Sequence, residues 1–447
     1  MRAPLARLQA TLARSGFVRN AFALISGTVA TQAIVFLCAP FLSRIFSVAD
    51  FGNFANYSAW VAFLALTGSL RYEHAIIVAK DRAEANRVFA LTMFVCVISV
   101  VIFEAVALAI SAGHSGGGYL REIAGILPYI PLGVLSACMG TPLAQLHIRT
   151  GLFRRLAAVG VAQVVASVAA QVILGVLKVN NGLIIGSIVG NVVSAAALAP
   201  LLWDRETMAQ LRDAVTMRQL RDTARTFVNF PRYTLPGDAI GVVTQQFFPV
   251  FVLALFGPTA AGLYAFSARI VRVPLIVVAT AVSAALRNEA MLRLQGEGDL
   301  ARLFSKTMRG LFLVSLLPFA AMLLYSHEIF ALVFGAKWRE AGTIVRILSP
   351  GILFEFVAFP LSVFFLVTGT QRYTFRIQLV GFISLATALW IGHRVLNNFI
   401  ATCGIISALM VAVNLASIIL AARVSRKGVV LVPPVADAGL LAQGEAL

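Results

Sequence analysis

Apolar stretches of about twenty residues recur along the whole chain, and they constrain its fold more than any other feature. Each is long enough to cross roughly 30 Å of hydrocarbon as a helix. The predicted spans are 20–41, 54–79, 88–111, 123–146, 153–177, 182–203, 236–256, 261–286, 307–326, 343–367, 374–393 and 398–422. Soluble domains are roughly a quarter charged, whereas only 12% of these 447 residues are charged and 60% are hydrophobic. The sequence therefore predicts an all-α polytopic membrane protein with about twelve transmembrane helices.

The basic residues are placed as a topology signal. A net charge of +17 is compatible with nucleic-acid binding, but the Lys and Arg residues lie in short loops between apolar segments, so we expect no nucleic-acid partner. With a cytoplasmic N-terminus, 26 of the 36 Lys and Arg residues lie on the cytoplasmic side and seven outside. The other three, Arg71, Arg269 and Arg272, lie within predicted helices. This distribution predicts a multi-pass protein with both termini in the cytoplasm.

The longest connection divides the predicted helices into six and six. We expect a six-helix lobe over 1–203, a cytoplasmic linker over 204–235, a second six-helix lobe over 236–422 and a cytoplasmic tail over 423–447. The linker has mixed charges, with apolar residues at every third or fourth position. This pattern fits either an amphipathic helix at the membrane interface or a solvated linker.

The two halves share a weak internal repeat. The segments FSVADFGNFA (46–55) and FGPTAAGLYA (256–265) align at a constant offset of 210 residues. The identities are Phe46 with Phe256, Gly52 with Gly262, and Ala55 with Ala265. A Thr-Gly turn followed by a basic helix start, as in IRTGLFRR and VTGTQRYTFR, also occurs in both halves. Because the offset spans six helices, both copies face the same way, so the lobes should be pseudo-symmetric about an axis along the membrane normal.

Two arginines one helical turn apart are the strongest candidates for a binding site. An Arg in mid-membrane costs at least ~2.5–3.5 kcal/mol, so it needs a partner or water. Arg269 and Arg272 are spaced i and i+3, which places them on one face of a helix. Two guanidinium groups there can bind one phosphate-bearing anion. The alternative is structural pairing with a carboxylate such as Glu73, Glu104 or Glu355.

Further polar residues lie in the same predicted helices. Arg71 and His74 are spaced i and i+3, with Glu73 predicted on another face. Arg71 either contacts substrate or extends to the inner headgroups. His74 is either a proton-linked switch or a packed histidine. Glu355 is expected to pair with an arginine or to sense a coupling cation.

Amide side chains occupy equivalent regions of the first and seventh predicted helices. They are Gln32, Gln245 and Gln246. These amides either contact sugar hydroxyl groups or form hydrogen bonds between helices. The four cysteines lie in apolar segments without metal-ligand spacing, and no phosphate-binding loop or catalytic constellation is present. We therefore expect neither an enzyme, nor a cofactor, nor a metal site.

The segment PFLSRIFSVADFGNFANYSAWVAFLALTGSLRYEHAIIVAKDRAEANRVF (40–89) resembles the N-terminal part of bacterial oligosaccharide flippases. Those are the polysaccharide transporters, O-antigen flippases among them, of the multidrug/oligosaccharidyl-lipid/polysaccharide exporter superfamily. The segments TGLFRRLA and FGPTAAGLYAFSARIVRVP fit the same pattern. The resemblance extends over nearly the whole chain, and it rests on diffuse patterns.

The resemblance implies two six-helix lobes around a central cavity lined by helices 1, 2, 7 and 8. It implies transport of an undecaprenyl-pyrophosphate-linked oligosaccharide across the bacterial inner membrane by alternating access. Further implied partners are the polysaccharide polymerase and the chain-length machinery. The related lipid II flippases place cavity arginines on helices 2 and 8, where Arg71, Arg269 and Arg272 fall in this sequence.

Three other functions compete with this one. A multidrug and toxin extrusion-type, cation-coupled exporter shares the fold, but its usually cationic cargo calls for acidic cavities. A membrane glycan polymerase or ligase would need a large periplasmic loop, and the predicted loops are short. A channel would need a selectivity filter, and no segment resembles one.

Overall fold

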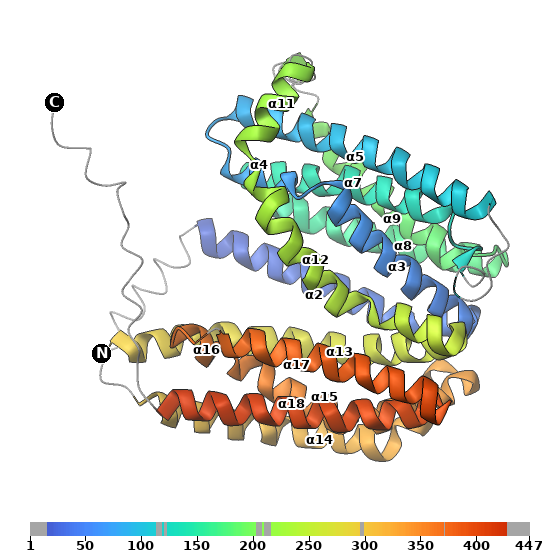
Figure 1. Cartoon of the computed structure of the whole chain (residues 1–447), viewed down its shortest axis with the longest axis vertical. Coiled ribbons are helices and arrows are strands. Elements are labelled where there is room, and N and C mark those ends of the chain that lie inside the picture. Colours follow the sequence, from blue (N-terminus) through green and yellow to red (C-terminus); the bar gives the residue numbers. More distant parts are fainter. Residues whose placement is uncertain are drawn as a thin grey trace. The chain divides into compact units, whose positions relative to one another are not determined.

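The computed structural model describes residues 16–112, 119, 123–202, 208–209, 216–295, 299–370 and 372–426. These residues form two compact units, which are described separately (Figure 1). Unit 1 contains the described residues up to Phe266 together with Val333–Trp338. Unit 2 contains those of Ser267–Leu332 and those from Arg339 onward. The two units are defined by contacts within the chain, and they do not test the predicted grouping into six and six helices. The lobes at 1–203 and 236–422 therefore remain a prediction.

Unit 1 is built from helices that pack side by side. The longer helices are α2 (Gly16–Ile45), α3 (Val48–Gly68), α5 (Arg82–Ala112), α7 (Tyr129–Arg149), α8 (Phe153–Val176), α9 (Gly182–Leu198) and α12 (Leu235–Gln246). Helix α8 packs against α2 and α9, while α7 packs against α3, α5 and α9. Helix α12 lies along α3. The last helix that enters this unit is the first part of α13 (Phe248–Gln295).

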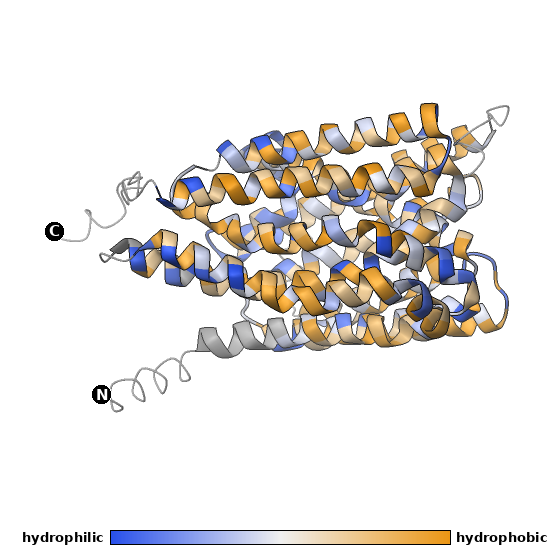
Figure 2. Cartoon of the chain, turned by 90° about the horizontal axis from the view of Figure 1, so that it is seen from below, coloured by the Kyte–Doolittle hydropathy of each residue, from blue (hydrophilic) through white to orange (hydrophobic). Residues whose placement is uncertain are grey.

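Unit 2 contains the rest of α13 and the helices that follow it. These are α14 (Leu300–Phe334), α15 (Arg339–Leu361), α16 (Val363–Val367), α17 (Arg372–Ile391) and α18 (Phe399–Arg426). Helix α18 packs against α15, α16 and α17. Figure 2 shows that hydrophobic residues predominate along the helices. The all-α polytopic fold predicted from the apolar stretches is confirmed.

The described helices include ten or eleven candidate membrane spans, close to the predicted twelve. Ten are long and apolar enough to span, and the bent pair Val48–Gly68 with Tyr72–Val78 makes an eleventh. One of the ten, Phe230–Arg293, has 64 residues, which is roughly 96 Å at about 1.5 Å per residue. Gly257 interrupts it with a non-helical φ of 84°. This segment is longer than one crossing needs and long enough for two, so the ten or eleven candidate spans are close to the predicted twelve.

The helix predicted over 54–79 is wrong in both of its bounds. Helix α3 begins at Val48 because Ser47 and Asp50 form a capping box: the Asp50 N–H donates to Ser47 Oγ, and the Ser47 N–H donates to the Asp50 carboxylate. The helix ends at Gly68 because Leu70 and Arg71 have φ values of 49° and 62°. A left-handed residue cannot continue a right-handed helix. The chain resumes, bent by 64°, in the 3-10 turn η1 (Tyr72–His74) and the short helix α4 (Ala75–Val78).

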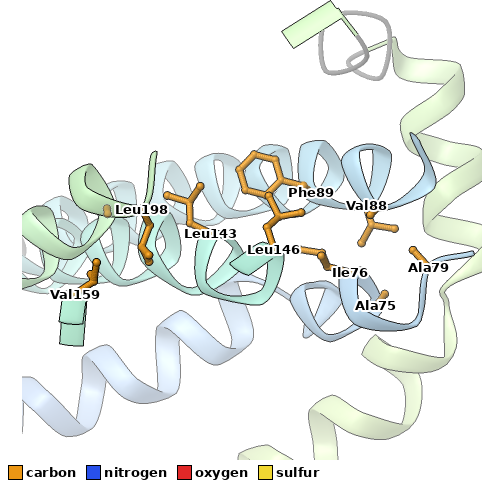
Figure 3. Close-up of a cluster of buried hydrophobic side chains, with 11 residues drawn as sticks. Ala75, Ile76, Ala79, Val88, Phe89, Leu143, Leu146, Val159 and Leu198 are labelled. Carbon is orange, nitrogen blue, oxygen red and sulfur yellow. The ribbon is translucent and has the colours of Figure 1, made fainter. Parts of the chain in front are cut away.

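A hydrophobic cluster holds the bent segment in unit 1. Ala75 and Ile76 of α4 are fully buried and pack with Val88 and Phe89 of α5 and with Leu146 of α7. Figure 3 shows these side chains gathered between the three helices. The bend is therefore fixed by packing on both sides of it, which fixes the position of Arg71 as well.

Part of the predicted cytoplasmic linker is a helix packed on the protein. Residues 203–207 and 210–215 lie outside the described part, while Met217–Thr226 form helix α11. Its buried Leu220 packs with Tyr72 and with Leu91 of α5. The expected amphipathic pattern is present, and its apolar side contacts the neighbouring helix.

The repeated glycines meet each other in unit 1. A Cβ atom at Gly52 would lie against the carbonyl oxygen of Pro258 and 2.9 Å from the Gly262 nitrogen. A Cβ atom at Gly262 would lie against the carbonyl oxygen of Val48 and 3.0 Å from the Gly52 nitrogen. Pro258 follows Val48, and Gly262 follows Gly52, by the same 210 residues. Such reciprocal contacts between equivalent positions mark a local two-fold relation between the two repeated segments within unit 1.

The short turn between α14 and α15 is anchored to the same part of unit 1. Trp338, in the 3-10 turn η4 (Ala336–Trp338), is fully buried and packs edge-on against Phe51 at a centroid distance of 5.1 Å. Its indole N–H donates to the Ser43 carbonyl over 2.9 Å. The Ser43 hydroxyl donates in turn to the carbonyl of Phe334 over 3.1 Å. Although the turn is short, its tryptophan therefore lies in the protein core.

We expect Trp338→Phe to destabilise the protein by about 1–3 kcal/mol, because the substitution removes the indole N–H and strands the buried Ser43 carbonyl. The measurement is the thermal unfolding midpoint of the purified protein in detergent. Trp390→Phe is the matched control, since Trp390 of α17 is 62% exposed. Equal shifts for the two variants would show that the Ser43 hydrogen bond contributes nothing.

Candidate functional site

The arginines of α13 lie on one helix face in unit 2, as their spacing predicts. Arg272 Nη2 lies 3.1 Å from Glu355 Oε2 of α15, and the two side chains are 33% and 41% exposed. This is the pairing expected for Glu355. Because both groups remain partly accessible, the pair can exchange partners with a charged ligand without first exposing a sealed core.

Arg269 differs from Arg272 in its surroundings. Its side chain is exposed. No ion pair or hydrogen bond joins it to any residue within the described ranges. Glu104 of α5, another carboxylate considered as a partner, is exposed. The face of α13 thus carries one compensated and one uncompensated positive charge, which is an arrangement suited to an anion.

Arg71 belongs to a separate ion-pair network in unit 1. Its Nε donates to Asp238 Oδ2 over 2.7 Å and its Nη2 lies 2.6 Å from the same oxygen, while Nη1 lies 3.1 Å from Glu73 Oε1. The shared helix face predicted for Arg71 and His74 is wrong, because the left-handed backbone at Arg71 breaks the helical register. That same conformation turns Arg71 towards Glu73, which was expected on another face.

Glu73 is the most buried charged group of this network. It is 1% exposed, and its Oε2 has no hydrogen-bond partner among the described residues. A buried carboxylate depends on its cationic partner. Arg71 therefore stabilises Glu73 as well as joining the bent segment to α12.

Asp238 was not identified from the sequence. It lies in the first turn of α12, where a carboxylate is favoured by the helix dipole. Glu355 was identified because it is a lone carboxylate in an apolar predicted helix. The same criterion would have identified Asp238. Its partner could not be predicted, because the contact depends on the break at Leu70 and Arg71.

We expect Arg71→Gln to destabilise the protein more than Asp238→Asn, because only the first substitution leaves the buried Glu73 without its cation. The coupling between Arg71 and Asp238 should be about 0.5–3 kcal/mol. Thermal unfolding of the two single variants and the double variant measures both quantities. A larger loss for Asp238→Asn would contradict the role of Arg71 in holding Glu73.

The remaining candidates are not brought into one site by the described contacts. Gln32 of α2 is half-buried, and Gln245 and Gln246 lie exposed at the end of α12. His74 is half-buried in η1, and its side chain makes no hydrogen bond or ion pair to another described residue. Their predicted roles in sugar contact and coupling stay predictions.

A polar cluster missed by the sequence analysis joins α3 to Tyr119. The Tyr119 hydroxyl accepts from Trp60 Nε1 over 2.8 Å and donates to Asn56 Oδ1 over 2.9 Å. Burial raises the pKa of Tyr119, although these two hydrogen bonds lower it in part. The phenol thus stays neutral and serves as a structural link. Residues 113–118 and 120–122 of the predicted outside loop lie beyond the described part.

The described residues contain no group of three or more His, Cys, Asp or Glu side chains placed to hold a metal ion. What the geometry offers is ion pairing on membrane-spanning helices, with a free guanidinium in unit 2. Together with the ten or eleven candidate spans of the described chain, this describes a polytopic membrane protein with charged groups on its helices.

The chain belongs to the polysaccharide biosynthesis protein family, whose model matches residues 41–343. This confirms the family resemblance read from the sequence. The protein is accordingly a multi-pass membrane protein of the polysaccharide biosynthesis family. No curated protein sequence matches the chain.

Solved structures of transporters share the fold at low sequence identity. The lipid II flippase MurJ in an inward closed conformation is 10% identical, with a TM-score of 0.63 over 89% of this chain and 87% of that chain. An inward-facing multidrug resistance MATE family transporter of the MOP superfamily is 14% identical, with a TM-score of 0.60 over 90% and 95%. A MOP superfamily transporter from Pyrococcus furiosus, described by a reverse polarity of its binding pocket, is 14% identical, with a TM-score of 0.54 over 92% and 95%. These likenesses establish the fold alone.

Proposed function

We propose that this protein moves an undecaprenyl-pyrophosphate-linked oligosaccharide from the cytoplasmic to the periplasmic leaflet of the bacterial inner membrane by alternating access. The glycan serves the synthesis of a surface polysaccharide such as O-antigen, capsule or exopolysaccharide. The observation that carries the proposal is the pair of arginines on one face of α13, of which only Arg272 is held by a carboxylate.

Charge balance explains how this face selects a diphosphate. Without substrate, Arg269, Arg272 and Glu355 together carry one net positive charge. A pyrophosphate diester carries about two negative charges, which match the two guanidinium groups once Glu355 is displaced. Charge-assisted hydrogen bonds to phosphate then replace the Arg272–Glu355 contact. The oligosaccharide head crosses with the diphosphate while the lipid tail stays in the bilayer.

A multidrug and toxin extrusion-type exporter is the second candidate, favoured by the likeness to the inward-facing MATE structure. The usually cationic cargo of such exporters argues against this candidate, because the uncompensated charge of Arg269 on α13 would repel a cation. A glycan polymerase or ligase is the third candidate, and the family and fold favour transport over it.

The test is deletion of the gene followed by analysis of surface glycans and lipid-linked precursors. We expect one surface polysaccharide to disappear and its undecaprenyl-linked repeat to accumulate in the cytoplasmic leaflet. A polymerase defect would instead leave single repeats on the periplasmic side. Unchanged glycans with increased drug sensitivity would overturn the proposal in favour of an extrusion pump. In the proposed pathway, the polysaccharide polymerase and the chain-length machinery act on the glycan after this protein has exported it.

We expect both termini in the cytoplasm, because the basic residues are concentrated on that side. Reporter fusions after Lys427 should be active in the cytoplasm, and fusions within 111–121 should be active in the periplasm. The opposite pattern at either position would contradict the proposed direction of transport as well.

A further inference from the structure

Unit 2 contains a cavity of about 350 Å³ that is lined by residues of α13, α16 and α17 and by Ser362. Its polar lining residues are Arg287, Ser362, Thr374 and Gln378, and its exposed apolar ones are Leu366 and Phe375. The cavity lies far along α13 from the arginine pair, since Arg287 follows Arg272 by fifteen residues. At about 1.5 Å per residue this is roughly 22 Å along the helix, so the two sites are distinct.

Arg287 has no counter-charge within the described part of the chain. The nearby carboxylates are already engaged: Glu289 lies 2.9 Å from Arg293, and Asp299 lies 4.0 Å from Arg302. No hydrogen bond or ion pair joins Arg287 to another described residue. Among the described residues nothing neutralises its charge at the cavity wall, which leaves that charge available to water or to an anion from outside the protein.

We infer that this cavity binds the phosphate headgroup of a membrane lipid. The guanidinium of Arg287 supplies a fork for phosphate oxygens, and Thr374 and Gln378 offer neutral hydrogen-bond donors beside it. Phe375 is 66% exposed and Leu366 is 44% exposed, so they present apolar surface for the lipid chain at the same opening. Basic pockets between helices bind anionic headgroups in this way.

The surrounding charges strengthen this assignment. Arg372 and Arg376 flank Phe375 on the first turns of α17 and are exposed. They raise the local concentration of anionic lipid, while Arg287 and its polar neighbours select the phosphate. The same headgroup chemistry is found on bulk anionic phospholipid and on an undecaprenyl-linked phosphate, and only the second source would rest on the proposed function.

The test uses the purified full-length protein in neutral detergent, with lipid binding followed by native mass spectrometry. The probes are phosphatidylglycerol, undecaprenyl phosphate, and diacylglycerol as a lipid that lacks phosphate. We expect both phosphate lipids to bind and diacylglycerol not to bind. Arg287→Gln should weaken binding by about fivefold or more. Gln378→Leu, which retains every charge, should weaken it by a smaller factor.

Arg309→Gln is the matched control, because Arg309 is an exposed arginine of α14 that does not line the cavity. It should leave phosphatidylglycerol binding within about twofold of the wild type. Equal weakening by Arg287→Gln and Arg309→Gln, or equal retention of diacylglycerol, would overturn the assignment. Tighter binding of undecaprenyl phosphate than of phosphatidylglycerol supports a place on the substrate route, and equal binding supports a bulk lipid headgroup. Neither result depends on glycan export, so loss of the proposed function leaves this test intact.

Discussion

Reversing the charge of either arginine on α13 should abolish glycan export. Arg269→Glu and Arg272→Glu each replace a phosphate-binding guanidinium by a carboxylate, which repels the diphosphate. Removing a charge-assisted hydrogen bond alone costs about 1.5–3 kcal/mol, so Arg→Ala at either position should weaken substrate binding by about tenfold or more. The measurement is glycan export in deletion cells that carry each variant, normalised to the amount of protein in the membrane.

The two arginines should differ in what their removal does to the protein itself. Arg269→Ala should leave the amount of folded protein unchanged, because the exposed Arg269 has no partner among the described residues. Arg272→Ala leaves Glu355 unpaired, so a modest loss of stability is expected there. Arg269→Lys keeps the charge without the fork and should export at an intermediate rate.

Glu355→Gln provides a control that separates binding from structure. It releases Arg272 without adding a charge, so substrate should bind more tightly and leave more slowly. If Arg269→Glu and Arg272→Glu both export at the wild-type rate, the diphosphate role is wrong. If the arginine variants fail to accumulate and a compensating change at Glu355 restores them, the arginines serve structure only.

The membrane spans and the internal repeat could be predicted because each depends on local sequence. A helix in hydrocarbon must satisfy its own backbone hydrogen bonds, so the length of an apolar stretch nearly determines the element. The glycine repeat was readable for a similar reason: close helix crossings accept only the smallest residues, and the pattern is retained in both halves.

The break after α3 could not be predicted, because Gly68 before it is still helical and the residues that turn the chain are not glycine. Leu70 and Arg71 adopt left-handed backbone conformations that non-glycine residues rarely take. The cost is offset by contacts distant in sequence, namely the ion pair with Asp238 and the burial of Ala75 and Ile76 between α5 and α7. The burial of Trp338 could not be predicted for the same reason. A short polar turn is normally exposed, and the contacts that bury Trp338 are with Ser43 and Phe51, which are distant in sequence.

The crossing of α3 and α13 should tolerate no side chain larger than hydrogen. Gly262→Ala places a methyl group against the backbone carbonyl of Val48, and Gly52→Ala places one against that of Pro258. Backbone atoms cannot rotate away as a side-chain end can, so the helices must separate. Overpacking of this kind costs about 1–3 kcal/mol, and Gly→Val at either position should prevent accumulation of folded protein.

Gly310→Ala is the matched control, because Gly310 lies within α14 with no atom within 4 Å of the added methyl group. It should keep the unfolding midpoint or raise it slightly, since alanine favours helix by up to about 1 kcal/mol over glycine. A fall as large as that of Gly262→Ala would show that the effect comes from glycine replacement in general and not from the crossing.

The two-fold relation adds a sharper expectation for the double variant. Because Gly52 and Gly262 contact one another at the crossing, the first methyl group already forces α3 and α13 apart. The second methyl group then enters space that has been opened, so the double variant should lose clearly less stability than the sum of the two single losses. Thermal unfolding of the four proteins measures this coupling directly. Additive losses would mean that the two sites relax independently, and the two methyl groups would then not act through one separation of α3 and α13.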